Sequence, residues 1–172
     1  MLTLPQLIAC MPYSGERAPI YLECLNTAMS EFSIDSLLRK SMFLAQVAHE
    51  SGSLRYTKEL ASGADYEGRL DLGNTHVGDG KRFPGRGLLQ VTGRTNTTKC
   101  LAALNRKLDD LDYLETPMGA SRSAGWFWYS NGLNMPADQG LFWTVSKKIN
   151  GGTNGLDDRI GHYIRCRKAL GL

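Results

Sequence analysis

Apolar side chains recur at helical spacing along most of the chain. Between residues 19 and 32 they follow one another mostly at intervals of three or four positions, with glutamates off the apolar stripe. This periodicity is typical of an amphipathic helix packed on a core. The same reasoning predicts further helices, and the full set covers residues 4–11, 19–32, 36–49, 95–108, 117–129, 138–149 and 156–170.

Residues with known helix-end preferences mark several of these boundaries. Thr3 comes shortly before Pro5, and Thr116 directly precedes Pro117. Both pairs suit a capping hydroxyl group followed by proline in the first turn. Gly151 follows the helix that ends near residue 149 and suits a C-terminal cap. We therefore predict a mainly α protein.

Other stretches lack the helical period. Residues 52–82 are rich in glycine and predict irregular loops with a short hairpin. Residues 85–93, GRGLLQVTG, alternate weakly, as a strand entering a turn does. An acidic connector is predicted at residues 109–112 and a loop at residues 131–136. Binding residues are commonly carried on such loops.

Glu50 follows the most apolar helix segment of the chain. From Met42 onward nearly every residue of the preceding helix is apolar, which predicts that this helix end is enclosed. Glu50 lies four and three positions after Gln46 and Val47 and so shares their face. Burial disfavours the charged form of a carboxyl group, so this environment suits a residue that must carry a proton.

The length and composition indicate one globular domain over residues 1–172. Hydrophobic residues make up 42% of the chain and charged residues 22%, which argues against disorder and fibrous structure. No apolar run approaches the about 18–20 residues of a membrane-spanning helix. The N-terminus has no basic segment and carries Pro5 in its apolar patch, which argues against a signal peptide. We expect a soluble monomer, made in the cytoplasm, without stable membrane association.

The cysteines and histidines do not indicate a metal site. No CxxC pair occurs among the four cysteines, which are Cys10, Cys24, Cys100 and Cys166. We expect four reduced thiols, mostly in the core. His49-Glu50 resembles the start of a zinc-binding HExxH helix, but position 53 is serine, so the second ligand is missing. We predict neither a metal nor a cofactor.

Basic residues gather in one part of the chain, although the net charge is only +3. No acidic residue occurs between Gly80 and Leu108, a stretch that contains Lys81, Arg82, Arg86, Arg94, Lys99, Arg106 and Lys107. Such a stretch favours a polyanionic partner, either nucleic acid or an anionic cell-wall polymer. The alternative is an ordinary solvated surface.

Two glutamates suggest acid–base chemistry. Hydrolysis of a glycosidic bond needs a protonated acid for the leaving oxygen and a carboxylate that activates water or attacks the sugar. Glu50 suits the acid, and Glu59, beside Lys58 in a polar loop, suits the ionised partner. Glutamates nine positions apart are common, so this spacing alone does not identify an enzyme.

A larger set of motifs resembles the family 19 glycoside hydrolases. It comprises AHESG at 48–52, RYTKEL at 55–60, GDGKRFPGRGLLQVTGRTN at 78–96 and SKKINGGTNGLDDRIGHYIR at 146–165. The resemblance covers about residues 35–170. Within that family, the chain looks most like the compact bacteriophage endolysins. It implies a lysozyme-like domain of two helical lobes, with a small loop and hairpin region around a substrate cleft.

The resemblance also implies roles for individual residues. Glu50 would be the general acid and Glu59 the general base of an inverting mechanism, with carboxyl groups about 6.5–9.5 Å apart. Thr92 would help Glu59 to hold the attacking water. Arg159 would lie beside the carboxylates and favour their ionised form. The residues expected to bind the substrate are Gln90, Asn96, Asn150 and Arg159.

Structural interpretations of some of these residues stay open. Arg86 can brace the glycine-rich loop by pairing with an acidic residue, and Asn150 can serve as a helix cap. Trp126 and Trp128 fit the core better than a sugar-stacking platform.

We expect an endolysin that cuts the β-1,4 bond between N-acetylmuramic acid and N-acetylglucosamine in bacterial peptidoglycan. It would accumulate in the host cytoplasm and reach the periplasm and wall with the help of a holin. Its partners would be peptidoglycan glycan strands and not nucleic acid. Chitin is the alternative substrate. A non-catalytic module that binds glycans or nucleic acid is the alternative of another class.

Overall fold

The computed structural model describes all residues 1–172 and contains helices joined by loops and turns. In chain order the helices are α1 (Leu4–Cys10), α2 (Arg17–Glu31), α3 (Leu37–Glu50), α4 (Asp79–Arg82), α5 (Arg94–Ala103), α6 (Pro117–Ser130), α7 (Asn134–Asp138), α8 (Phe142–Asn150) and α9 (Leu156–Leu170). Short 3-10 helices are η1 (Ala64–Tyr66), η2 (Leu70–Leu72) and η3 (Leu111–Glu115). The predicted mainly α fold is confirmed.

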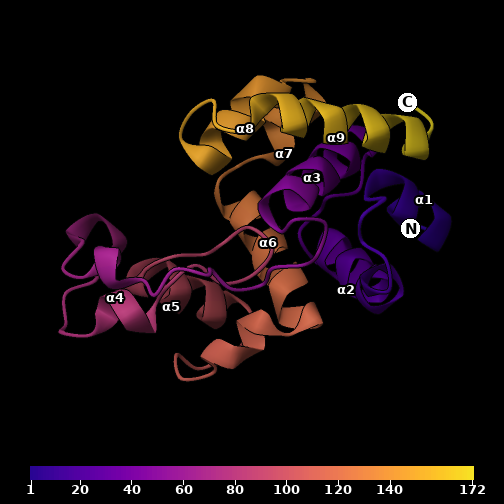
Figure 1. The fold of residues 1–172 in the computed structure, drawn as a ribbon. Helices are drawn as coiled ribbons and strands as arrows, with labels where there is room; N and C mark the ends of the chain where they lie inside the picture. Colours follow the sequence, from indigo (N-terminus) through magenta and orange to yellow (C-terminus); the bar gives the residue numbers. More distant parts are fainter.

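Helix α6 lies between two groups of elements (Figure 1). On one side are α1, α2 and α3, and α2 packs directly on α6. On the other side are α4, α5 and the loops around them, and α5 also contacts α6. Helix α9 packs along α3 and on α1, which brings both ends of the chain to the same side of the molecule. This is the two-lobed, lysozyme-like arrangement that the sequence predicted.

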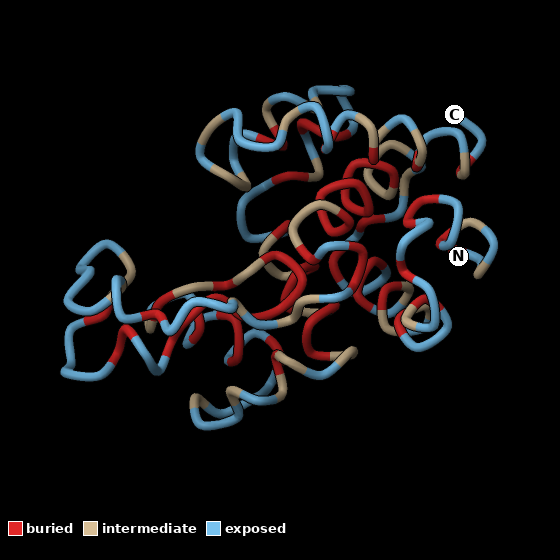
Figure 2. The backbone as a smooth tube through the Cα atoms, in the orientation of Figure 1, coloured by how far each residue is buried: buried red, intermediate tan, exposed pale blue.

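Helix α3 forms the centre of the core (Figure 2). Residues 41–48 are all buried, which confirms the predicted enclosure of this helix end. The ring of Phe43 meets the edge of Trp128 from α6, with centroids 5.5 Å apart and planes at 84°. This edge-to-face packing is favourable for aromatic rings. Because α3 is held from several sides, its last residue, Glu50, has a fixed position.

The predicted helix caps are present. The Thr3 hydroxyl accepts a hydrogen bond from the Gln6 backbone N–H, and the Gln6 side chain accepts one from the Thr3 N–H. Thr116 accepts a hydrogen bond of 3.1 Å from the Gly119 N–H. Gly151 ends α8 in the left-handed region, with φ of 74°. Caps of this kind contribute about 1 kcal/mol each.

The structure corrects several predicted boundaries. Residues 131–136 are not all loop, because α7 begins at Asn134, whose side chain accepts a hydrogen bond from Trp128 Nε1 and donates one to the Phe32 carbonyl. Helix α5 ends at Ala103 and not near residue 108, since Asn105 adopts a positive φ of 57°. The acidic connector leads into η3.

The strand predicted for GRGLLQVTG is wrong. Gly87 and Gln90 have positive φ values of 82° and 51°, which an extended strand does not allow. The segment instead folds into a tight turn with an isolated antiparallel bridge between Arg86 and Val91, and a second bridge joins Arg86 to Lys58. These two bridges take the place of the expected hairpin, and the neighbouring stretch contains the unpredicted short helix α4.

The four cysteines are free, and three of them are buried. This agrees with the expectation of reduced thiols mostly in the core. Burial raises the pKa of the Cys100 thiol to about 12. None of the helices has the length and hydropathy needed to cross a membrane.

Candidate active site

Glu50 is the last residue of α3 and forms an ion pair with Arg159 of α9. The helix stops here because Gly52 enters the left-handed region, with φ of 57°. The Arg159 side chain is only 2% exposed, whereas the Glu50 side chain is 22% exposed. Arg159 Nη2 donates to Glu50 Oε1, and Oε2 has no hydrogen-bond partner in the protein. The structure therefore brings together Glu50 and Arg159, as the motifs predicted.

A buried glutamine holds Arg159 in place. Arg159 Nη1 donates to Gln46 Oε1, and Gln46 Nε2 donates to Ser146 Oγ at 2.8 Å. Gln46 is fully buried and Ser146 is 1% exposed. The Arg159 Nε group donates to the Asn154 carbonyl at 3.3 Å. Sequence reasoning missed Gln46, although an isolated glutamine in an otherwise apolar helix end was a usable signal.

His49, next to Glu50, also contacts helix α9. Its Nδ1 lies 2.7 Å from Asp158 Oδ2. Burial raises the pKa of Asp158, but the hydrogen bond with His49 and the charge of His162 outweigh it and lower that pKa overall. A side chain could not replace Gly155, because a Cβ there would lie 2.3 Å from the His49 ring. Asp158 thus joins the start of α9 to the end of α3 through His49.

Glu59 lies in the loop beyond α3 and is held by two donors. The Tyr66 hydroxyl donates to Oε1 at 2.8 Å, and the Gly85 N–H donates to Oε2 at 3.0 Å. Burial and this hydrogen bond to Glu59 raise the pKa of Tyr66. These two hydrogen bonds engage both oxygens of the Glu59 carboxylate. Tyr66, which the sequence analysis did not select, therefore fixes the second glutamate.

Arg86 organises the loop between Glu59 and the glycine-rich turn. Its Nε donates to Glu115 Oε1 at 2.8 Å, and its Nη1 donates to the Arg82 carbonyl at 2.9 Å. Lys58 pairs with the same carboxylate at 2.9 Å. The bracing role considered for Arg86 is what the structure shows. The chain on either side of Glu59 is thereby fixed against residues 85–91.

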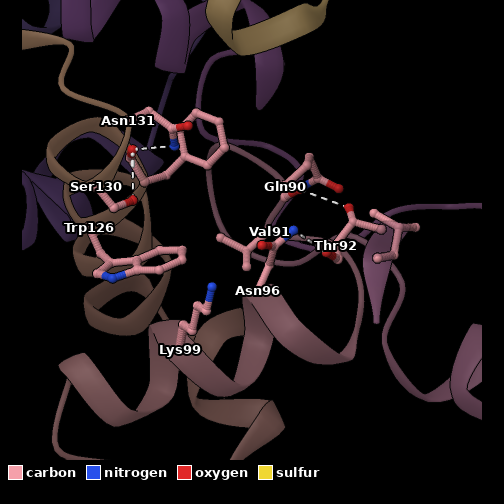
Figure 3. Close-up of a pocket in the computed structure, with 10 residues that line it drawn as sticks. Gln90, Val91, Thr92, Asn96, Lys99, Trp126, Ser130 and Asn131 are labelled. Atoms are coloured by element: carbon pink, nitrogen blue, oxygen red, sulfur yellow. Dashed lines mark hydrogen bonds between the residues drawn. The ribbon is translucent and has the colours of Figure 1, made fainter. Parts of the chain in front are cut away.

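A cavity of about 360 Å³ lies beside this turn (Figure 3). Its walls come from η2, the turn, α5 and α6 and consist of Leu72, Gln90, Val91, Thr92, Asn96, Lys99, Trp126, Phe127, Ser130 and Asn131. The structure thus gathers three of the predicted site residues, Gln90, Thr92 and Asn96. Gly85, which binds Glu59, is adjacent, since a Cβ there would lie 2.7 Å from Gln90 Oε1 and 3.2 Å from Thr92 Oγ1.

The two tryptophans of α6 lie in different environments. Trp128 is fully buried in the core, as expected. Trp126 is partly buried, packs against the core as expected, and also lines the cavity. The reason is geometric, because residues two apart on a helix point in different directions.

Asn150 is not among the residues that line the cavity. Its Oδ1 accepts a hydrogen bond from the Gly152 N–H at 2.7 Å, and its Nδ2 donates to the Asn154 carbonyl at 2.8 Å. It orders the loop between α8 and α9, and the Asn154 carbonyl that it contacts also accepts from Arg159. This geometry matches the structural interpretation of Asn150, and contact with a substrate stays a prediction.

Comparison with known proteins identifies the family. No family model matches the chain. A Haemophilus influenzae protein described as a glycosyl hydrolase family 19 domain-containing protein is 29% identical over 157 residues, which cover 73% of this chain and 77% of that protein. An Arabidopsis thaliana endochitinase is 34% identical over 137 residues, or 75% of this chain and 47% of that protein. The chain belongs to the family 19 glycoside hydrolases.

Solved structures support the same fold. A bacterial family 19 chitinase superposes with a TM-score of 0.81 at 22% identity, covering 99% of this chain and 95% of that one. Chitinase C from Streptomyces griseus gives a TM-score of 0.78 at 24% identity and covers 99% of this chain and 76% of that one. The chain spans about half the length of the Arabidopsis endochitinase.

The family 19 chain is a glycoside hydrolase, and its geometry offers two differently placed carboxylates. Glu50 stands at an apolar helix end with one oxygen free, and Glu59 sits in a loop with both oxygens accepting hydrogen bonds. No group of three or more His, Cys, Asp or Glu side chains is placed to hold a metal ion. Carboxyl groups placed in this way can donate and accept protons.

Proposed function

We propose that this family 19 enzyme hydrolyses the β-1,4 bond between N-acetylmuramic acid and N-acetylglucosamine in peptidoglycan. The observation that carries the proposal is the contrast between its two glutamates. Glu59 accepts hydrogen bonds on both oxygens, which fix its carboxylate in the loop. Glu50 has one oxygen without a protein partner at the end of a buried helix, so this oxygen is free to face the leaving glycosidic oxygen.

In this mechanism Glu50 donates a proton to the leaving glycosidic oxygen and Glu59 activates a water on the opposite face of the sugar. Arg159 binds Oε1 of Glu50, so Oε2 is the oxygen left to transfer the proton. Thr92 donates its hydroxyl hydrogen to the Gln90 carbonyl at 2.9 Å, which leaves its oxygen lone pairs directed elsewhere and able to accept from the attacking water. Inversion at the anomeric carbon follows from direct attack by water.

The positive charge of the stretch between Gly80 and Leu108, which contributes to the cavity wall, supports an anionic substrate. Arg86 and Arg94 pair with Glu115 and Asp79, respectively. Several other basic residues of the same stretch form no ion pair within the protein, namely Lys81, Lys99, Arg106 and Lys107. Peptidoglycan carries carboxylates on its stem peptides, whereas chitin is neutral, so this surplus favours the wall polymer.

Chitin is the second candidate substrate. The names of the Arabidopsis relative and of the Streptomyces structure favour it, since both are chitinases. Both polymers contain β-1,4-linked N-acetylglucosamine, and the amide and hydroxyl groups that line the cavity suit the acetamido group of either. We further propose that the enzyme is a monomeric bacteriophage endolysin. In this role it accumulates in the host cytoplasm, reaches the periplasm through a holin, and binds glycan strands without nucleic acid or stable membrane association.

The test is product analysis of purified peptidoglycan and of chitin oligosaccharides. Products are reduced with borohydride and identified by mass spectrometry, with wild type and Glu50→Gln in parallel. We expect new reducing ends at muramic acid for wild type and a loss of turnover of at least about 100-fold in Glu50→Gln, because the amide cannot donate the proton. Glu16→Gln, an exposed glutamate at the start of α2, is the matched control and should keep full activity.

Other products would change the assignment. Reducing ends at glucosamine would move the cut to the other bond of the wall polymer. Release of chitin oligomers with no wall product would make the enzyme a chitinase. Turnover that survives in a folded Glu50→Gln protein would exclude Glu50 as the acid. Binding of the polymers by wild type without any turnover would favour the non-catalytic module.

A further inference from the structure

The cavity beside Thr92 contains one charged residue. Of the side chains that line it, all are apolar or carry neutral amide and hydroxyl groups except Lys99. An ammonium group in an otherwise neutral sugar-binding lining is not needed for N-acetylglucosamine, whose polar groups are hydroxyl and acetamide. The feature to explain is therefore the position of this single cation.

Lys99 is placed to face the cavity. It lies one turn after Asn96 on α5, and residues three apart share a helix face. Figure 3 shows its side chain extending between Trp126 and Asn96, towards the space that these residues enclose. Trp126 from α6 and Asn131, directly after this helix, form the opposite wall. The ammonium group is thus presented beside an aromatic ring and an amide.

The ammonium group of Lys99 has no partner inside the protein. It forms no ion pair and no hydrogen bond, and no acidic side chain lines the cavity. Nearby cations are different, since Arg94 is bound by Asp79 and Arg82 by Asp109 at 2.6 Å. Those arginines stabilise the loop. Lys99 is left free to bind a group from outside.

We propose that Lys99 binds a carboxylate of the muramyl unit, so that this cavity is the subsite that distinguishes peptidoglycan from neutral polymers. The inference rests on the proposed function of the same site. The carboxylate belongs to the stem peptide where the peptide is attached, and to the lactyl ether of muramic acid where the peptide has been removed. In both cases Trp126 supplies an apolar face for the sugar ring, Asn96 and Asn131 are available to its acetamido group, and Lys99 supplies the opposite charge.

The contribution of Lys99 to binding can be estimated from the exposure of its side chain. Lys99 is exposed, and an exposed ion pair contributes up to about five-fold in binding at moderate ionic strength. The contribution is screened by salt. It should be realised in KM, because the charge lies on the substrate before and after the bond breaks.

The experiment compares two substrates that differ only in charge. One is native peptidoglycan, and the other is the same polymer with its carboxyl groups converted to methylamides by carbodiimide coupling. Initial rates are measured for wild type, Lys99→Met, Lys99→Arg and Lys168→Met. Lys168 is an exposed lysine near the end of α9, so its substitution gives the same change in net charge at a distant place.

We expect wild type to cleave the native polymer with a kcat/KM about five-fold above that of the amidated polymer. Lys99→Met should lose this preference through KM, Lys99→Arg should restore most of it, and Lys168→Met should behave as wild type. Strands stripped of peptide by an amidase gain a free lactyl carboxylate, because the cleaved amide bond had joined this group to the peptide. A preference for these strands over their methylamidated form shows that Lys99 also accepts the lactyl carboxylate, and no such preference restricts the subsite to the carboxylates of the stem peptide.

The outcomes that overturn the inference are distinct from those that overturn the function. If wild type cleaves peptidoglycan and Lys99→Met keeps the full preference for the charged polymer, the Lys99 subsite is wrong and the function stands. If wild type prefers neither polymer, the subsite is likewise wrong. If wild type cleaves neither polymer, the proposed function fails and the subsite with it.

Discussion

Gln46 offers the most direct test of how the protein positions its proposed acid. Its side chain is fully buried and joins three helices, because it accepts from Arg159 of α9 and donates to Ser146 of α8. In Gln46→Leu the volume is nearly kept, but both partners lose their hydrogen bond. A guanidinium N–H and a serine hydroxyl would then be buried and unpaired.

The expected loss of stability can be estimated from these two unpaired groups. An unsatisfied buried polar group costs about 1–3 kcal/mol, and more when it is charged. The free energy of unfolding should therefore fall by about 2–5 kcal/mol, a large part of the about 5–15 kcal/mol typical of a domain. For a chain of this length that corresponds to a decrease in Tm of about 5–15 °C. Turnover should also fall, since Arg159 is no longer held against Glu50.

The assay is urea unfolding followed by circular dichroism, together with kcat and KM on the cleaved substrate. Ser41→Ala is the matched control, because Ser41 is a fully buried polar residue of the same helix whose hydroxyl only contacts the Leu38 carbonyl. The double variant Gln46→Leu/Ser146→Ala should be less destabilised than the sum of the single variants, since both remove the same hydrogen bond. A Gln46→Leu protein with unchanged kcat and a loss below about 1 kcal/mol would refute the reasoning.

Two further predictions concern groups outside the proposed chemistry. The hydrogen bonds from Arg94 lower the pKa of Asp79, so the stability that ionised Asp79 provides is present above its ordinary pKa of about 3.9 and is lost as the pH falls through the lower folded-state value. Asp79→Asn should therefore lower Tm at pH 7 and flatten the decrease in Tm below about pH 4; an equally steep decrease would contradict this. For the thiols, we expect Cys24 alone to react with a disulfide reagent in the folded protein at pH 8, and all four to react in urea, because the other three are buried and burial raises the pKa of Cys100 to about 12. Rapid labelling of Cys100 in the folded protein would show that α5 opens locally.

The helices were predictable because each shows its own periodicity. The pattern from Ile20 to Phe32 places α2, and the apolar run after Met42 places the buried end of α3. Thr116 and Pro117 fix the start of α6 through local chemistry alone. Such signals are contained in short windows of sequence, so they survive without knowledge of the rest of the fold.

The loops were less predictable because their geometry depends on distant partners. Gln90 has a positive φ, which a glutamine in the sequence does not predict. The turn that contains it is braced by the ion pair of Arg86 with Glu115. The motifs led to the ion pair of Glu50 with Arg159. They did not reveal Gln46, Tyr66, Lys99 or Trp126, since the roles of these side chains arise only when α3, the loop, α5 and α6 meet.

The pairing of Glu50 with Arg159 also has a consequence for biosynthesis. The two residues are separated by 109 positions, so α3 leaves the ribosome well before α9 does. A chain released from the exit tunnel up to α8 already contains both glutamates and the cavity, but no cation for Glu50. Contacts of such long range are expected to form late in folding. Catalytic competence should therefore appear only after α9 has left the exit tunnel, in one step with the docking of α9 on α3.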